Sequence, residues 1–190
     1  MEQTFTENRI YEKIDFKESP LLKGEYENCI FKQCDFSGAD LSSTRFVDCR
    51  FLGCNLSLAK LNKTAFRVVH FEECKMLGLN FSVCNDFGLS FSFTNCSLNH
   101  SSFYKTKIKK TLFTNLKLQE VDFTECDLTA SVFESCDFSG AVFDRTTIEK
   151  ADLRTSFNYS IDPEINRIKK AKFSAAGIAG LLNKYDIVIE

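Results

Sequence analysis

The chain has 190 residues, of which 44% are apolar, and this composition suits one domain with a continuous core. Its formal net charge of −2 gives no argument for a nucleic-acid or charged-membrane partner, and no apolar run reaches the roughly 18 residues of a membrane span. Residues 1–13 are polar and acidic, unlike a signal peptide, and we predict that they cap the N-terminal end of the domain.

Between residues 14 and 173 a large apolar residue recurs at nearly every fifth position. The series runs through Phe36, Leu41 and Phe46. A small residue stands two positions before each of them, as Cys34 stands before Phe36. Neither the 3.6-residue period of a helix nor the two-residue period of a strand produces this spacing. A short fixed period instead predicts a solenoid, in which each unit buries its apolar face against its neighbours.

The five-residue register changes once, near Asp86, Phe87 and Gly88. Twelve residues separate Phe81 from Phe93, which equals two repeats and two additional residues. Because the spacing is regular on both sides of this point, we interpret the additional residues as a local bulge and not as a boundary between domains.

Residues 174–190 leave the five-residue pattern. Ser174 can serve as an N-cap, and Ile178, Leu181 and Leu182 recur at helical spacing, although two glycines weaken the helix. We predict an amphipathic helix followed by a short strand. The apolar side chains of this helix are expected to cap the solenoid and to pack against a second copy of the chain in a symmetric homodimer.

The nine cysteines all fall at the small-residue positions of the repeat. Their number is odd, and they alternate there with Ala, Ser, Thr and Val, as small core-filling residues do. We therefore expect buried free thiols and a reducing, cytoplasmic location. The nine are Cys29, Cys34, Cys49, Cys54, Cys74, Cys84, Cys96, Cys126 and Cys136.

The sequence offers little to a catalytic or metal site. His70 and His100 occupy positions that should point outward, whereas the cysteines should point inward, so a Cys/His metal site cannot assemble. The chain contains no GxGxxG, GK(S/T), HExxH or GxSxG motif. We predict a protein that is not an enzyme and that binds no cofactor or metal.

Two charge clusters stand out from the polar background. One is a run of acidic residues without lysine or arginine, formed by Glu120, Asp122, Glu125, Asp127, Glu134, Asp137 and Asp144. The other is a basic patch just before it, formed by Lys105, Lys107, Lys109, Lys110 and Lys117. The acidic run is either a chance result of polar outward positions or a surface for a protein partner. The basic patch is small and contains one aromatic residue, Tyr104, so we expect no nucleic-acid partner.

The unit Ala39-Asp40-Leu41 is one copy of an A(D/N)LXX pattern, and through it the chain resembles the pentapeptide repeat family over most of its length. The resemblance implies an all-β fold, a right-handed quadrilateral β-helix with one pentapeptide on each of four faces. Each coil would then take twenty residues, giving about eight coils. Residues one coil apart share a column, and we predict stacked rings at Phe51, Phe71, Phe93, Phe113 and Phe133. Stacked cysteines would lie about 4.8 Å apart, too far for disulfides.

The sequence is also similar to the quinolone-resistance (Qnr-like) group of this family in its length and in its terminal segment, GIAGLLNKYDIVI. That resemblance implies a cytoplasmic dimer that mimics duplex DNA and binds DNA gyrase and topoisomerase IV. Residues 145–172 carry seven basic against four acidic side chains, whereas a DNA mimic needs a negative surface. The alternative is therefore a structural or scaffold protein with another protein partner.

Overall fold

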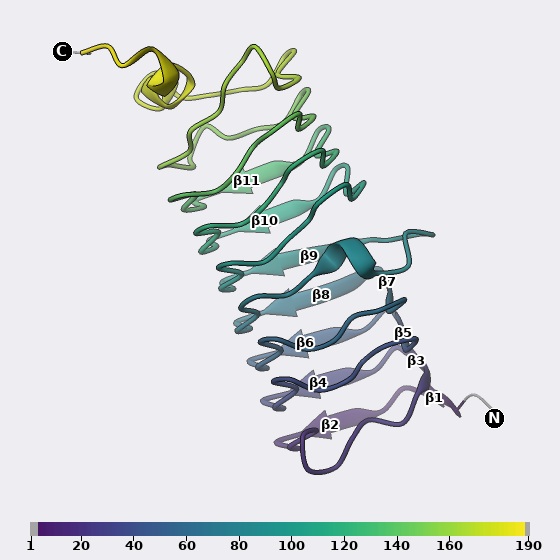
Figure 1. Ribbon diagram of the computed structural model, residues 1–190. Helices are drawn as coiled ribbons and strands as arrows, with labels where there is room; N and C mark the ends of the chain where they lie inside the picture. The colour runs from purple at the N-terminus through teal and green to yellow at the C-terminus, as the bar shows by residue number, and fades with distance from the viewer. Residues whose placement is uncertain (1–3, 189–190) are drawn as a thin grey trace.

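The structure describes residues 4–188, which wind as a rod of stacked coils with the two ends far apart (Figure 1). In this computed structural model every strand pairs in parallel with a strand one coil away, as Phe31 pairs with Phe51. The architecture is a right-handed quadrilateral β-helix, so the fold that the repeat predicts is confirmed.

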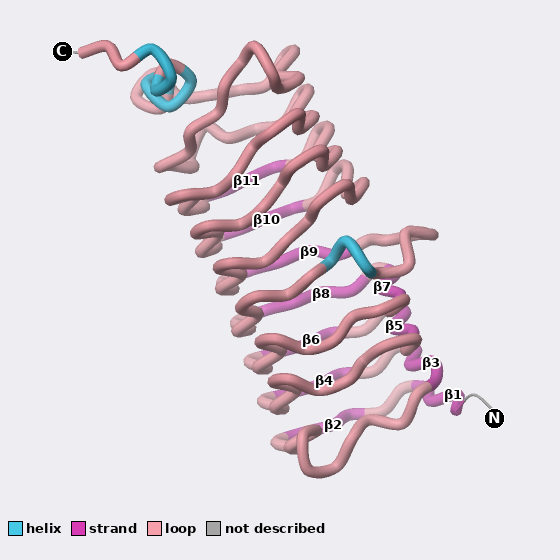
Figure 2. Tube along the Cα trace, in the orientation of Figure 1, coloured by secondary structure: helices cyan, strands magenta, loops and turns pink. Residues whose placement is uncertain are grey.

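Two of the four faces carry parallel sheets, drawn in magenta in Figure 2. The larger sheet has seven strands, β2 (Ile10–Glu12), β4 (Ile30–Lys32), β6 (Arg50–Leu52), β8 (Val69–Glu72), β9 (Phe91–Thr94), β10 (Leu112–Thr114) and β11 (Val132–Glu134). The smaller sheet has four, β1 (Thr4–Glu7), β3 (Gly24–Glu27), β5 (Arg45–Val47) and β7 (Ala65–Arg67). Beyond β11 the coils continue through isolated bridges. About seven turns therefore pair as a regular sheet, whereas the sequence predicts about eight coils.

Strands β1 and β2 lie inside the segment that the sequence predicts as an N-terminal cap. β1 pairs with β3 and β2 pairs with β4, and the ring of Tyr11 stacks on Phe31 with 4.9 Å between centroids. The chain from Thr4 onward therefore already belongs to the first coil. Residues 1–3 lie outside the described residues.

The predicted column of phenylalanines is confirmed along the larger sheet. Consecutive ring centroids from Phe51 to Phe133 are 5.1, 5.3, 5.6 and 4.5 Å apart, and all four pairs are stacked. The contact between Phe71 and Phe93 spans the two additional residues without a break in register. The stack is the centre of a core that runs the length of the rod.

The corners of each coil explain the five-residue period. The backbone turns at residues with left-handed φ, such as Asn115, Glu120 and Glu125 with φ of 53°, 55° and 56°. Three positions before such a corner, an aspartate or asparagine stabilises the turn, because Oδ1 of Asp122 accepts a hydrogen bond from the N–H of Thr124 at 2.9 Å. The Asp/Asn position of the A(D/N)LXX pattern is therefore a backbone-capping position.

The two additional residues project from the face of the smaller sheet, next to β7 (Figure 1). A 3₁₀ turn, η1 (Phe81–Val83), precedes the loop, and the chain rejoins the coil where the N–H of Ser90 bonds to the carbonyl of Phe66. Phe87 is 74% exposed at this loop, with the Arg67 guanidinium 5.2 Å from the centre of its ring. The loop occupies the place of the next strand and so ends the smaller sheet.

The C-terminal segment differs from the predicted helix and strand. Two short 3₁₀ turns, η2 (Ile178–Leu181) and η3 (Asn183–Tyr185), replace the amphipathic α-helix, and residues 186–188 form no strand. The glycines that weaken the helix allow close contact with Tyr159, because a Cβ added at Gly180 would lie 2.2 Å from the Tyr159 carbonyl oxygen. The rest of the predicted strand, residues 189–190, lies outside the described residues.

All nine cysteines are free, and eight are buried. Seven of the thiols donate to backbone carbonyls inside the coil, as Cys136 Sγ donates to the Phe113 carbonyl at 3.4 Å. Burial raises the pKa of Cys136 and of Cys126 to about 12. These two thiols therefore stay neutral and act as small core-filling groups.

Candidate functional site

The acidic residues that the sequence groups together are distributed around the whole coil. Glu134 lies on β11, whereas three aspartates form bridges on other faces, Asp137 with Lys117, Asp122 with Ser102, and Asp127 with Lys107. The remaining acids, Glu120, Glu125 and Asp144, lie at or beside corners. Neighbours in the chain point in different directions because each pentapeptide occupies a different face.

Four of the seven acids lie next to a basic side chain, in most cases one on an adjacent coil. Glu125 lies between Lys105, at 3.5 Å, and Arg145, at 3.4 Å. The Lys109 ammonium lies 3.0 Å from Asp127. Asp144 pairs with Arg145 at 3.1 Å, and Glu120 Oε2 lies 3.2 Å from His100 Nδ1. The absence of lysine and arginine in the linear segment therefore does not create a purely negative surface.

Several of these acids also serve the fold itself. Oδ1 of Asp127 accepts from the N–H of Thr129 at 3.1 Å, and Oδ1 of Asp137 accepts from the N–H of Ser139 at 3.1 Å. Burial tends to raise the pKa of Asp137, but hydrogen bonds from Ser139, Asn158 and Gln119 hold it at about 2. Three of the seven acids, Asp122 included, thus have a structural role in their turns.

The two histidines are exposed, as expected, and each bonds to a neighbouring coil. His70 Nδ1 lies 2.7 Å from Ser92 Oγ, and His100 pairs with Glu120. Within the described residues, no group of three or more His, Cys, Asp or Glu side chains is placed to hold a metal ion. In the same part of the chain, no helix has the length and apolar character needed to cross a bilayer.

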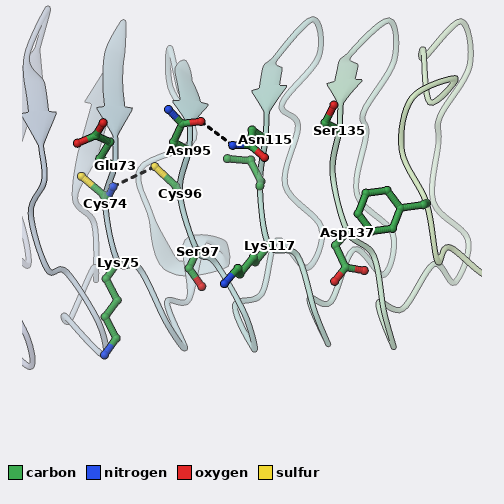
Figure 3. A pocket seen from close by; sticks show the side chains of 12 residues that line it. Glu73, Cys74, Lys75, Asn95, Cys96, Ser97, Asn115, Lys117, Ser135 and Asp137 are labelled. Carbon is green, nitrogen blue, oxygen red and sulfur yellow. Dashed lines mark hydrogen bonds between the residues drawn. The ribbon is translucent and has the colours of Figure 1, made fainter.

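A shallow groove of about 440 Å³ follows the coil axis along one corner (Figure 3). One wall is a ladder of corner side chains in which Asn115 Nδ2 donates to Asn95 Oδ1 at 2.8 Å. The other wall carries Lys75, Ser97, Lys117 and Asp137, which Figure 3 shows on the opposite side of the floor. Phe157, 48% exposed, also lines the groove.

The groove offers polar and charged side chains that can bind a partner. Its floor holds Cys74 and Cys96, whose thiols donate to the carbonyls of Phe51 and Phe71 at 3.4 and 3.5 Å. The described lining contains no histidine, and its carboxylates are Glu73 and Asp137. This surface is not recognisable in the linear sequence, because its residues come together only when every twentieth residue is compared.

The C-terminal end presents apolar side chains at the end of the rod. Of the three residues predicted for the cap and dimer, Leu181 packs against the core, Leu182 is half-buried and Ile178 is 49% exposed. Ile187 and Val188, farther along the chain, are also exposed. Leu181 therefore has the covering contact expected of a cap, and Ile178 is free to meet another surface.

A family model described as pentapeptide repeat region matches residues 25–92 and 89–157. Among solved structures, full-length QnrB1, a plasmid-mediated fluoroquinolone resistance protein, is 19% identical with a TM-score of 0.58, over 97% of this chain and 100% of that one. A trypsin-treated QnrB1 gives a TM-score of 0.64 at 19% identity, over 99% and 98% of the two chains. At this identity the likeness establishes a shared fold. No curated protein matches the sequence.

Proposed function

Because the chain belongs to the pentapeptide repeat family, we propose that it is a non-catalytic β-helix that acts by binding another protein. The filling of the coil interior by apolar side chains supports a binding role best. Rings and aliphatic side chains such as Phe113 and Leu118 fill the coil and are fully buried, so only the outward side chains are left to act. A rod of this kind presents long, regular rows of side chains, which suits recognition of an extended partner surface.

DNA gyrase or topoisomerase IV is the partner class that we propose first, with protection from quinolones as the result. The support is the match to QnrB1, a fluoroquinolone resistance protein, along nearly the full length of both chains. A rod that mimics duplex DNA would meet the basic DNA-binding groove of the enzyme through its acidic side chains. Such binding depends on charge complementarity and weakens as salt increases.

A scaffold role with a different protein partner is the second candidate. The pairing of Glu125 and Asp127 with lysine and arginine on adjacent coils favours it, because paired acids contribute little negative potential to a DNA mimic. The groove between Asn95 and Lys117 is the surface that we assign to such a partner.

Supercoiling by purified gyrase, with and without the protein and in the presence of a fluoroquinolone, tests the first candidate. We expect the protein to restore supercoiling. A variant with five acids replaced by Asn or Gln, at Asp122, Glu125, Asp127, Glu134 and Asp137, should lose gyrase binding at low salt. A matched variant neutralises five acids near the N-terminus, at Glu12, Glu27, Asp35, Asp40 and Glu72, and should keep it. Absence of binding by the parent protein at low salt favours the scaffold role.

We further propose a cytoplasmic homodimer joined end to end at the C-terminus. Nine free cysteines suit a reducing compartment. The exposed Ile178, Ile187 and Val188 would be covered by the same residues of a second copy. Sedimentation equilibrium is expected to give a dimer for the parent and a monomer for Ile178→Asp. A monomeric parent at high protein concentration would contradict the dimer.

A further inference from the structure

One face of the rod gathers positive charge after the loop at residues 84–90. We call this surface the basic face. It lies on the side that the smaller sheet covers in the N-terminal half, continued past the point where the loop ends that sheet. Its seven basic side chains are all exposed and comprise Lys107, Lys109, Lys110, Lys150, Arg167, Lys169 and Lys170.

The backbone pairing places these residues together although about sixty positions separate the first from the last. Lys107 bridges to Asp127, Asp127 to Thr147, and Thr147 to Arg167. At the adjoining corner, Lys110, Lys150 and Lys170 occupy equivalent left-handed positions, with φ of 57°, 59° and 60°. At strand spacing, three coil steps give the basic face a height of about 15 Å.

The charge on this face is strongly unbalanced. Among the outward positions of these four coils on this face, seven basic residues stand against two acids, Asp127 and Glu149, an excess of five. Both acids are already paired, Asp127 with Lys109 at 3.0 Å and Glu149 with Arg167 at 2.8 Å. In the described chain the remaining five have no carboxylate within 4.0 Å; they are Lys107, Lys110, Lys150, Lys169 and Lys170.

Side-chain chemistry on the basic face favours a phosphate backbone over a protein partner. Protein interfaces depend on aromatic and large apolar anchors, and none of the exposed large apolar side chains of the described chain belongs to this face. Single-stranded nucleic acid needs aromatic rings for base stacking, which this face also lacks. Lysine binds phosphate as a point charge and needs no apolar burial.

We propose that the basic face binds the phosphate backbone of duplex nucleic acid without reading its base sequence. The expectation of no nucleic-acid partner rests on the net charge of the whole chain and on the basic patch between Lys105 and Lys117. Neither quantity includes the charges that adjacent coils bring together on one face. The inference does not rest on the proposed protein partner, because it is argued from basic side chains, whereas that proposal uses acidic ones. Of the five acids in the gyrase variant only Asp127 lies on this face, where it is paired with Lys109. Contact by five lysines predicts a slope of log K against log salt of about −4.5.

The test is fluorescence anisotropy of the full chain with a labelled mixed-sequence DNA duplex of about 20 base pairs. Between about 50 and about 200 mM salt, the parent affinity should fall about 500-fold. Replacement of the corner lysines Lys110, Lys150 and Lys170 by glutamine leaves two of the five lysine–phosphate contacts. The affinity of this variant for the duplex should therefore fall only about 12-fold over the same change in salt. Glutamine is suited to this corner conformation, since Gln33 adopts it with φ of 52°.

Two control variants separate a specific face from general charge. The first control variant has glutamine in place of Lys13, Lys60 and Lys63, which gives the same change in net charge outside the basic face. Two of these residues, Lys13 and Lys63, also lie at left-handed corners. This variant should bind duplex like the parent. The three corner lysines replaced by arginine should keep the parent slope. Circular dichroism and thermal melting of each variant verify that it is folded.

Several results would overturn the proposal. The parent could show no duplex binding at about 50 mM salt. The control glutamine variant could lose affinity as much as the corner variant does. A single strand of equal length could bind more tightly than the duplex, or vesicles of anionic lipid could bind where the duplex does not. Binding that depends on duplex sequence would contradict recognition of the backbone alone.

Discussion

Phe113→Ala is the substitution that tests the solenoid most directly. The Phe113 ring is 0% exposed and stacks between Phe93 and Phe133, with centroid distances of 5.6 and 4.5 Å. It also meets the ring of Phe103 edge-on at 6.5 Å. Its removal opens a cavity in the middle of a continuous core, and the flanking coils cannot close it without breaking their backbone pairing on both sides.

The expected loss in the free energy of unfolding is about 3–5 kcal/mol. Transfer of a phenylalanine side chain out of the core accounts for about 1.5–3 kcal/mol, and the unfilled cavity for the rest. Urea denaturation followed by circular dichroism measures the difference. Phe113→Leu should cost less than about 1.5 kcal/mol, because Leu153 already occupies the same column one coil beyond Phe133.

Phe157→Ala is the matched control for this experiment. Phe157 is 48% exposed, so its truncation should lower the free energy of unfolding by only about 1 kcal/mol, well below the loss expected at Phe113. If Phe113→Ala cost as little as Phe157→Ala, the stacked column would not be the main source of stability. A loss at Phe113 that left one half of the rod folded would show instead that the coils unfold in separate units.

Three further outcomes are expected. Val68→Asn should stabilise the protein by about 1 kcal/mol in thermal unfolding, because a β-branched residue at φ of 54° is strained and asparagine tolerates that conformation; a lower melting temperature would contradict this. The pKa of Asp137 is about 2 against an ordinary 3.8, so its contribution to the free energy of unfolding is complete above about pH 4 and is lost as the pH falls toward 2. Asp137→Asn should therefore make the urea midpoint less dependent on pH between about pH 4 and about pH 2. A pH dependence equal to that of the parent would refute this role of Asp137. Deletion of residues 174–190 should give aggregated or unfolded protein in gel filtration, whereas a monodisperse monomer would remove the capping role.

The fold follows from the sequence because its period has one physical cause. A left-handed corner, a capping Asp or Asn and a large buried residue recur together, as Asp122, Phe123 and Glu125 illustrate. The register across the bulge was also predictable. When the two additional residues are left out of the count, Phe93 falls in the same column as Phe71, and the two rings do stack. Because the same pattern recurs, the conformation expected for one repeat can be checked against all the others.

The C-terminal segment was less predictable because it is not repetitive. Helical spacing of Ile178, Leu181 and Leu182 predicted an α-helix, but local spacing does not include the contact with Tyr159. Gly177 and Gly180 lie so close to Tyr159 that the chain follows the end of the last coil in short 3₁₀ turns. Tertiary packing thus overrode the local preference.

Charge was the property that the linear sequence described least well. In a coil of four faces, residues five apart point in different directions, whereas residues twenty apart lie on adjacent coils. The acidic run from Glu120 to Asp144 therefore separates onto four faces, where four of its seven carboxylates pair with side chains such as Lys105 and Lys109. The scattered Lys110, Lys150 and Lys170 instead come together at one corner. Electrostatic potential depends on distance in space, so a partner of this rod responds to the charge of a column and not to that of a segment. Charge clusters in a solenoid sequence consequently have to be counted by position within the coil before a partner is assigned to them.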